Sequence, residues 1–148
     1  MRRARWLAAC ALGLAACGLA PDVGTPLAGA CSNADTDEAM AVSFRSEIRP
    51  LIARSVAGCS CHLPSSSGPG PGVLLGGLDL SSLSSLRAGG FNGGSANVVS
   101  AQPCDSVMYQ KVYEAPPFGS RMPLGGPYWS EDEVELLHDW IAEGAADN

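Results

Sequence analysis

Basic residues are scarce in this chain, and their scarcity excludes one large class of partner. Lys and Arg together number nine, against fifteen Asp and Glu, which gives a formal net charge of −6 over 148 residues. Proteins that bind nucleic acid need a basic surface to neutralise the phosphates. We therefore expect no nucleic-acid partner, and the acidic balance indicates a surface that keeps the protein in solution.

Catalytic patterns are missing as well. The sequence contains only two histidines, His62 and His138. It shows no Ser/His/Asp order, no pair of carboxylates at catalytic spacing and no phosphate-binding glycine loop. The acids at 131–133 and at 135 are typical of the first turn and the solvent face of a helix. We therefore expect the chain not to be an enzyme.

The longest apolar run is too short to cross a bilayer, and its position indicates a secretory signal. Three arginines among the first five residues precede an apolar stretch over 6–16, whereas a membrane helix needs about 20 residues. The stretch ends in Leu-Ala-Ala before Cys17, the pattern after which bacterial lipoproteins are cleaved and lipidated. We expect a signal peptide over 1–16 and a lipid on Cys17. An ordinary signal peptide with a chance cysteine is the alternative.

That anchor implies a place in the cell and an arrangement of the chain. We expect a protein of the cell envelope, held by its lipid at the outer membrane and facing the periplasm or the cell surface. Residues 17–42 have no apolar periodicity and predict a flexible tether. Cys31 lies inside this tether and suggests a local clamp onto a single small domain over 43–146.

Apolar spacing predicts a helix at each end of this domain. Ser43 is compatible with the start of the first helix, and Pro50 makes a kink or two short helices as good an interpretation as one continuous helix. Ser130 and Glu133 form a capping box for the last helix. Its predicted apolar stripe consists of Val134, Leu137, Trp140 and Ile141.

Between these helices the sequence predicts long loops. Gly and Pro number 18 and 11, and they concentrate in 63–77 and 89–94, which we interpret as irregular. Leucines over 78–86 indicate a turn or short helix, and 106–113 predicts another short helix. We find no internal repeat and no convincing β pattern. The predicted fold class is a small all-α domain with long Gly/Pro-rich loops.

The residues with most chemistry are Cys59, Cys61 and His62, in the order C-x-C-H. Covalent haem attachment normally uses C-x-x-C-H, in which two thiols add to the haem vinyl groups and the histidine binds iron. Thiols two positions apart point about 200° apart on a helix, so both cannot attach in the usual geometry. Gly58 occupies the position of the usual first cysteine. The remaining pair predicts one haem c held by Cys61 and His62, with Met122 as the distal iron ligand.

The cysteine count leaves several pairings open. After lipidation four thiols remain: Cys31, Cys59, Cys61 and Cys104. One thioether on Cys61 leaves three thiols, although Cys59 can then pair with Cys104 or Cys31. Two disulfides without haem would use all four thiols. Attachment of the haem through both Cys59 and Cys61, together with a Cys31–Cys104 disulfide, would also use all four. A Cys59–Cys61 disulfide would close a very tight ring.

Other interpretations of these side chains are possible. Cys59, Cys61, His62 and Cys104 together could hold zinc. Met122 could simply fill the core, as methionine often does, and Met108 and Met40 are other thioethers. His138, on the last helix, is interpreted as a partly exposed surface group and is the fallback distal ligand.

Several segments together resemble a known family. They occur in the order FRSEIRPLI, C-x-C-H, GGLDLSSL, PCDSVMYQKV and RMPLGGPYWSEDEVELLHDWIAEGA. The chain from Ser43 to Ala145 is similar to the cytochrome c-like domains of planctomycete and myxobacterial secreted proteins and lipoproteins. The resemblance implies a cytochrome c-like helical fold, with His62 as proximal and Met122 as distal ligand. Cys61 matches the second attaching cysteine of that family. The resemblance also suggests a disulfide between Cys104 and Cys59.

Two functions follow as expectations. The first is a membrane-anchored electron-transfer module that binds one haem and exchanges electrons with a redox partner protein. The second is a haem-free, disulfide-stapled surface lipoprotein of the same fold that acts in interaction or structure.

Overall fold

The structure, a computed structural model, describes residues 31–113, 116 and 118–148 of the chain. The predicted signal peptide over 1–16, the lipidation site Cys17 and the first part of the expected tether lie outside the described residues. Within the described part, no helix combines the length and the apolar character needed to cross a membrane.

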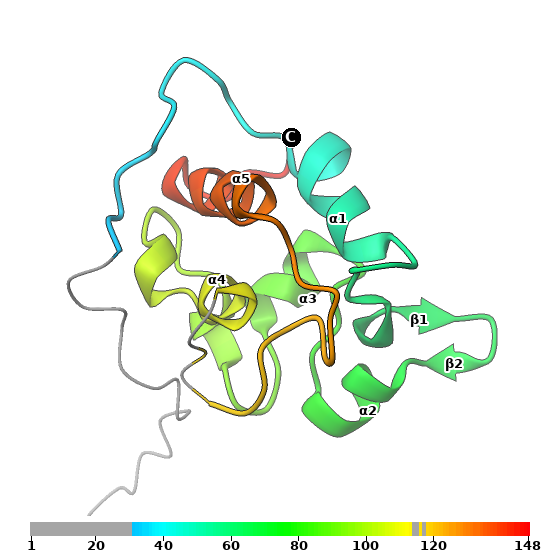
Figure 1. Ribbon diagram of the computed structural model, residues 1–148. Coiled ribbons are helices and arrows are strands. Elements are labelled where there is room, and N and C mark those ends of the chain that lie inside the picture. Colours follow the sequence, from blue (N-terminus) through cyan, green and yellow to red (C-terminus); the bar gives the residue numbers. More distant parts are fainter. Residues whose placement is uncertain (1–30, 114–115, 117) are drawn as a thin grey trace, which may run out of the picture.

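Short helices dominate the fold, and a small hairpin projects from them (Figure 1). Two β-strands pair in an antiparallel sheet, so the prediction of an all-α domain is wrong. The elements, in chain order, are η1 (Phe44–Ile48), α1 (Arg49–Ala53), η2 (Ser60–His62), β1 (Pro64–Ser65), β2 (Gly68–Pro69), α2 (Pro71–Gly76), α3 (Leu83–Ala88), η3 (Gly94–Asn97), η4 (Pro103–Asp105), α4 (Val107–Val112) and α5 (Glu131–Ala142).

The hairpin lies in a segment that the sequence predicted to be an irregular loop. Pro64 faces Pro69 across the two strands, and the proline rings hold both positions at a φ compatible with extended backbone. Gly68 has a φ of 121°, which a residue with a side chain rarely adopts. Helix α2 follows at once, with Pro71 in its first turn and the left-handed Gly77 at its end. The Gly and Pro residues therefore build turns and helix ends here.

The predicted first helix is present in two parts. A single π-helical turn, η1, leads directly into α1, and the Ser43 hydroxyl caps η1 by accepting from the Ser46 amide at 3.2 Å. Pro50 lies in the first turn of α1, directly after the π-helical turn, and has no N–H to donate to the carbonyls of that turn. The hydrogen bonding thus changes from π to α at this junction, while the backbone stays helical through Ile48 and Arg49.

Helix α5 organises the core. Its predicted capping box is confirmed, since the side chains of Ser130 and Glu133 each bond the other's backbone amide. The ring of Phe44 stacks on that of Trp140 with centroids 5.2 Å apart, which joins η1 to α5. All four residues of the predicted apolar stripe are buried: Val134, Leu137, Trp140 and Ile141.

Residues 31–42, the second half of the expected tether, run along α5 and bond to it (Figure 1). The Thr36 hydroxyl donates to the Asp139 carboxylate at 2.6 Å. The Val42 amide donates to the Glu143 carboxylate at 2.9 Å. This half of the segment therefore belongs structurally with the domain.

A disulfide fixes the same segment to the domain. It joins Cys31 to Cys104, which are separated by 73 positions in the sequence. The pairing of Cys104 with Cys59 that the resemblance suggested is therefore wrong, because Cys31 lies beside Cys104. Among the described cysteines, Cys59 and Cys61 are free thiols.

Replacing both Cys31 and Cys104 with Ser should lower the free energy of unfolding by about 2–4 kcal/mol, because a long loop regains its freedom in the unfolded chain. Urea denaturation followed by circular dichroism measures this change. Cys61→Ser is the matched control, since Cys61 is exposed and unpaired. Equal stability of the double variant and the control would contradict the prediction.

Candidate functional site

One cavity brings together three residues that the sequence pointed to: His62, Met122 and Cys59. Its volume is about 300 Å³, at the lower end of the range for small-molecule sites. Leu124, one of its lining residues, is 72% exposed, so the wall reaches the molecular surface. Most of the other lining side chains are apolar: Leu78, Leu80, Val107, Met108, Val112 and Phe118.

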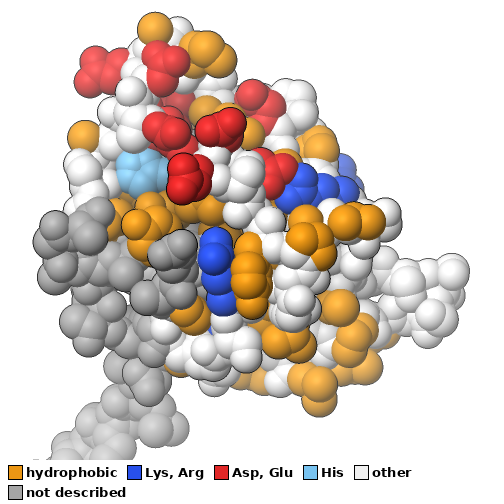
Figure 2. All heavy atoms as spheres, viewed as in Figure 1, with side chains coloured by type: hydrophobic (Ala, Val, Ile, Leu, Met, Phe, Trp, Pro, Cys, Tyr) orange, Lys and Arg blue, Asp and Glu red, His pale blue; other side chains and the backbone are white. Residues whose placement is uncertain are grey.

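Charge is unevenly distributed over the surface (Figure 2), and one basic residue lines the cavity. On the face that Figure 2 shows, acidic side chains gather over α5 and the segment 31–42, and apolar side chains are more frequent in the lower half. Lys111 is the charged residue among those that line the cavity. Burial lowers the pKa of its ammonium. The cavity is therefore a place for a largely apolar ligand.

His62 is held at both its ring and its backbone by one passing segment. Its Nδ1 lies 3.1 Å from the Leu78 carbonyl oxygen, and its own carbonyl accepts from the Leu80 amide at 2.9 Å. A carbonyl oxygen can only accept, so Nδ1 carries the proton. In the neutral ring the free lone pair is then on Nε2, the arrangement usual for a metal-binding histidine.

The backbone of α2 packs closely against the same ring. A Cβ atom at Gly72 would lie 2.7 Å from both Cε1 and Nδ1 of His62, which is closer than such atoms approach. Glycine at this position therefore lets the backbone of α2 pack directly against the Cε1–Nδ1 edge of the His62 ring. Sequence reasoning missed Gly72 and Leu78, because nothing in a Gly/Leu-rich stretch marks which member touches a histidine.

Met122 lies at the end of a loop that α4 holds in place. Its amide donates to the Lys111 carbonyl at 2.7 Å. The Lys111 ammonium also donates to the carbonyls of Phe118 and Ser120, at 2.7 and 2.6 Å. Arg121 donates from Nε to the Val112 carbonyl at 2.8 Å. These bonds bring the thioether-bearing loop to the cavity wall.

The two free cysteines differ in their surroundings. Cys59 is half-buried, packs against the core and lines the cavity, whereas Cys61 is exposed and is not among the lining residues. Burial raises the pKa of the Cys59 thiol to about 11, so this group is a protonated thiol at neutral pH. The structure thus places Cys59, and not the predicted Cys61, in the wall of the cavity that His62 and Met122 also line.

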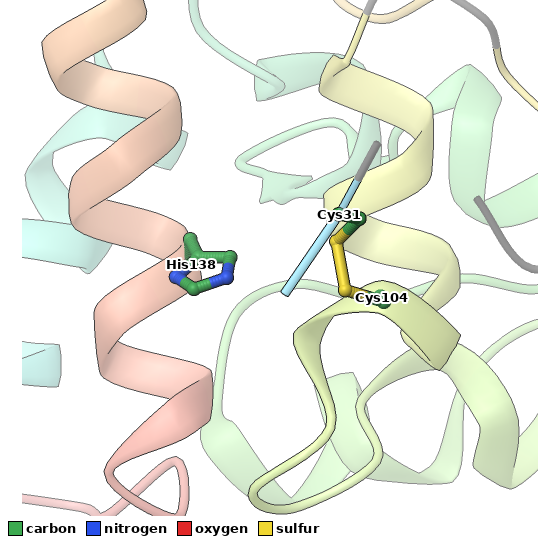
Figure 3. A group of neighbouring side chains, drawn as sticks. All are labelled: Cys31, Cys104 and His138. Carbon is green, nitrogen blue, oxygen red and sulfur yellow. A yellow bond between two sulfur atoms is a disulfide. The ribbon is translucent and has the colours of Figure 1, made fainter. Parts of the chain in front are cut away.

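His138 lies away from this cavity and is not the surface group that the sequence predicted. It projects from α5 toward the Cys31–Cys104 disulfide (Figure 3). Only 6% of the residue is exposed, and its two ring nitrogens lie 2.8 Å from Asp139 Oδ1 and 2.6 Å from the Ser32 carbonyl. With both nitrogens bonded and both sulfurs joined, this cluster fixes the 31–42 segment and has no free ligand atom for a metal. The disulfide also removes Cys104 from the zinc set that the sequence allowed.

A salt bridge fixes the turn that leads to Cys59. Arg54 pairs with Glu133, with Nη2 and Oε2 2.9 Å apart. The carbonyl of Ala57, in that turn, accepts from Arg54 Nε at 3.3 Å and from Trp129 Nε1 at 2.7 Å. The bond from Arg54 is the main reason that the pKa of the Glu133 carboxyl falls from 4.5 to about 2. The start of α5 thus positions the cysteine segment.

Comparison with known proteins adds no further constraint: neither a protein-family model, nor a curated protein, nor a solved structure matches this chain.

Gly72→Ala should displace the His62 ring and destabilise the fold by about 1–3 kcal/mol, the usual cost of overpacking. Because the chain has two histidines, ¹⁵N NMR of the imidazoles resolves each ring. We expect the His62 signals to move and those of His138 to remain. Gly76→Ala is the control, since its Cβ would lie 4.0 Å from His62 Cε1, an ordinary contact. Unchanged His62 signals in Gly72→Ala would show that the ring does not pack there.

Glu133→Gln should destabilise the protein at pH 7 by on the order of 1–2 kcal/mol, since the amide keeps the helix cap and loses the ion pair. A carboxylate with a lowered folded pKa contributes stability above its unfolded pKa. That contribution is lost as the pH falls from about 4.5 toward 2. Urea unfolding of both proteins at several pH values should therefore show their difference shrink over this range. Asp132→Asn, a change at an exposed neighbour, should show no such convergence.

Proposed function

We propose that this chain is a monohaem electron-transfer protein of the c type, held at the outer membrane by a lipid on Cys17. His62 and Met122 would bind the iron, and a cysteine of the 59–62 segment would attach the haem covalently. A redox protein would be its partner, and the chain would transform no substrate of its own.

The observation that carries this proposal is that His62 and Met122, far apart in the sequence, line one apolar cavity. Hydrogen bonding of His62 Nδ1 to the Leu78 carbonyl leaves Nε2 as the ligand atom. An imidazole with a thioether is the ligand pair of cytochromes c. The donor types and the mostly apolar walls are those that a haem site uses, and the opening of the wall at Leu124 would leave part of the ring outside the 300 Å³ cavity.

When bound, the haem iron would alternate between its ferrous and ferric states and supply the one-electron chemistry. The thioether of Met122 and the apolar cavity walls would both favour the less charged, reduced state, so these residues would raise the potential. Lys111 and Arg121 hold the loop that presents Met122. Leu78 and Gly72 would keep the His62 ring in one orientation.

Expression of the full chain in a host with c-type maturation machinery tests the proposal. We expect a Soret band and a mass, under denaturing conditions, of polypeptide plus haem. Met122→Ala should remove the thioether-to-iron absorption band and lower the potential, because the thioether ligand is lost. Met40→Ala is the matched control, since Met40 is exposed and does not line the cavity.

Other outcomes contradict the proposal in separate ways. Loss of the thioether band in Met108→Leu, with the band kept in Met122→Ala, would assign the ligand to Met108, which lines the same cavity. The absence of a Soret band, with the mass of the polypeptide alone, would overturn haem binding. The haem-free, disulfide-stapled surface lipoprotein would then be the better account of the chain.

A further inference from the structure

We infer that Cys59, and not Cys61, is the cysteine that joins haem covalently, through a single thioether bond. The inference rests on the proposed function, since it concerns how this chain holds the haem proposed above. It departs from the spacing argument, in which Cys61 directly before His62 was the attaching residue.

The local helix type places Cys59 on the same side as His62. Residues Ser60–His62 form a turn of 3₁₀ helix, and Cys59 precedes it as the N-terminal cap. A 3₁₀ helix has three residues per turn, so side chains three positions apart lie one above the other. The His62 amide donates to the Cys59 carbonyl at 2.8 Å and fixes this relation. The thiol and the imidazole accordingly line one cavity.

The same geometry turns Cys61 away. Its side chain is exposed, and it is not among the residues that line the cavity. Its carbonyl oxygen packs tightly under the next segment, since a Cβ atom at Gly70 would lie 2.4 Å from it and one at Gly72 would lie 2.9 Å from it. Turning the Cys61 backbone so that its side chain reached the cavity would therefore push its carbonyl against Gly70 and Gly72.

Two of the other described cysteines are not available to pair with Cys59. Cys31 and Cys104 are joined to each other, on the side of the domain where α5 carries His138 (Figure 3). Cys59 is held at its own backbone too, since its amide donates to the Ile52 carbonyl at the end of α1 at 2.8 Å. A fixed free thiol thus lies in the same cavity wall as the iron ligand.

The bond-forming step balances without a further reactant. The Cys59 sulfur bonds to one carbon of a haem vinyl group as its S–H bond breaks, and the hydrogen adds to the other vinyl carbon. The vinyl double bond becomes a single bond, and no net electrons enter or leave. One vinyl group stays intact, because among the described residues Cys59 is the one thiol that lines the cavity.

The test compares wild type, Cys59→Ser and Cys61→Ser, each expressed as the full chain with c-type maturation machinery. Intact mass under denaturing conditions measures how much protein carries covalent haem. Trypsin releases the stretch between Arg54 and Arg87 as one peptide, and its fragmentation in the mass spectrometer shows which cysteine carries the haem. We expect wild type and Cys61→Ser to retain equal amounts, and Cys59→Ser to retain at least tenfold less. The reduced pyridine haemochrome spectrum should report one unreacted vinyl group.

Folding and haem loss are separated by two checks. Cys59→Ala is a second variant, and circular dichroism with an intact Cys31–Cys104 disulfide shows that each variant is folded. In wild type, a thiol reagent should label Cys61 and leave Cys59 unlabelled.

The outcomes distinguish the two proposals. Covalent haem in Cys59→Ser but not in Cys61→Ser would overturn the inference and leave electron transfer by a haem protein intact. A spectrum with both vinyl groups reacted would also overturn it, in favour of double attachment. No haem in the wild-type protein would overturn the proposed function and this inference together.

Discussion

The hydrogen bond from the His62 ring to the Leu78 carbonyl is the interaction on which the candidate site depends. It fixes the tautomer of the ring. Together with the bond from the Leu80 amide to the His62 carbonyl, it holds the two ends of the segment 63–77 close to each other. Within that segment, Gly72 brings the backbone of α2 against the ring. A segment rich in Gly and Pro, with few apolar anchors of its own, is therefore ordered around one histidine.

The two histidines and four described cysteines are divided between two sides of the domain. His138 has both ring nitrogens bonded and lies beside the Cys31–Cys104 disulfide, so these side chains offer no free donor atom to a metal, although His138 and Cys31 line a second cavity of about 400 Å³. His62 and the free thiol of Cys59 line the apolar cavity instead. Identical residue types thus act as staples on one side and as candidate ligands on the other, because their hydrogen bonds and burial differ.

Local signals in the sequence predicted the helices better than they predicted the site. The capping box at Ser130 and Glu133 and the stripe of α5 depend on residues within a few positions, and both are present. The hairpin was missed because Gly and Pro mark turns inside regular structure as well as loops. The sequence pointed to Cys61 because it directly precedes His62, and it could not show that a 3₁₀ turn brings Cys59 to the cavity that His62 lines. Pairing of Cys31 with Cys104 depends on contacts across 73 positions, which spacing alone does not give.

Covalent attachment of a ligand through Cys59, in the apolar cavity wall, would have a thermodynamic advantage in so small a domain. Apolar surface that faces water forgoes about 25 cal/mol per Å² of stabilisation, and this cavity wall is mostly apolar. A ligand that covers the wall stabilises only the folded chain, and by mass action this effect normally falls as the ligand is diluted. A covalent bond removes that dependence. The disulfide fixes the 31–42 segment near α5. A haem held by Cys59 and His62 would add apolar contacts at the cavity, where short helices and glycine-rich loops provide few.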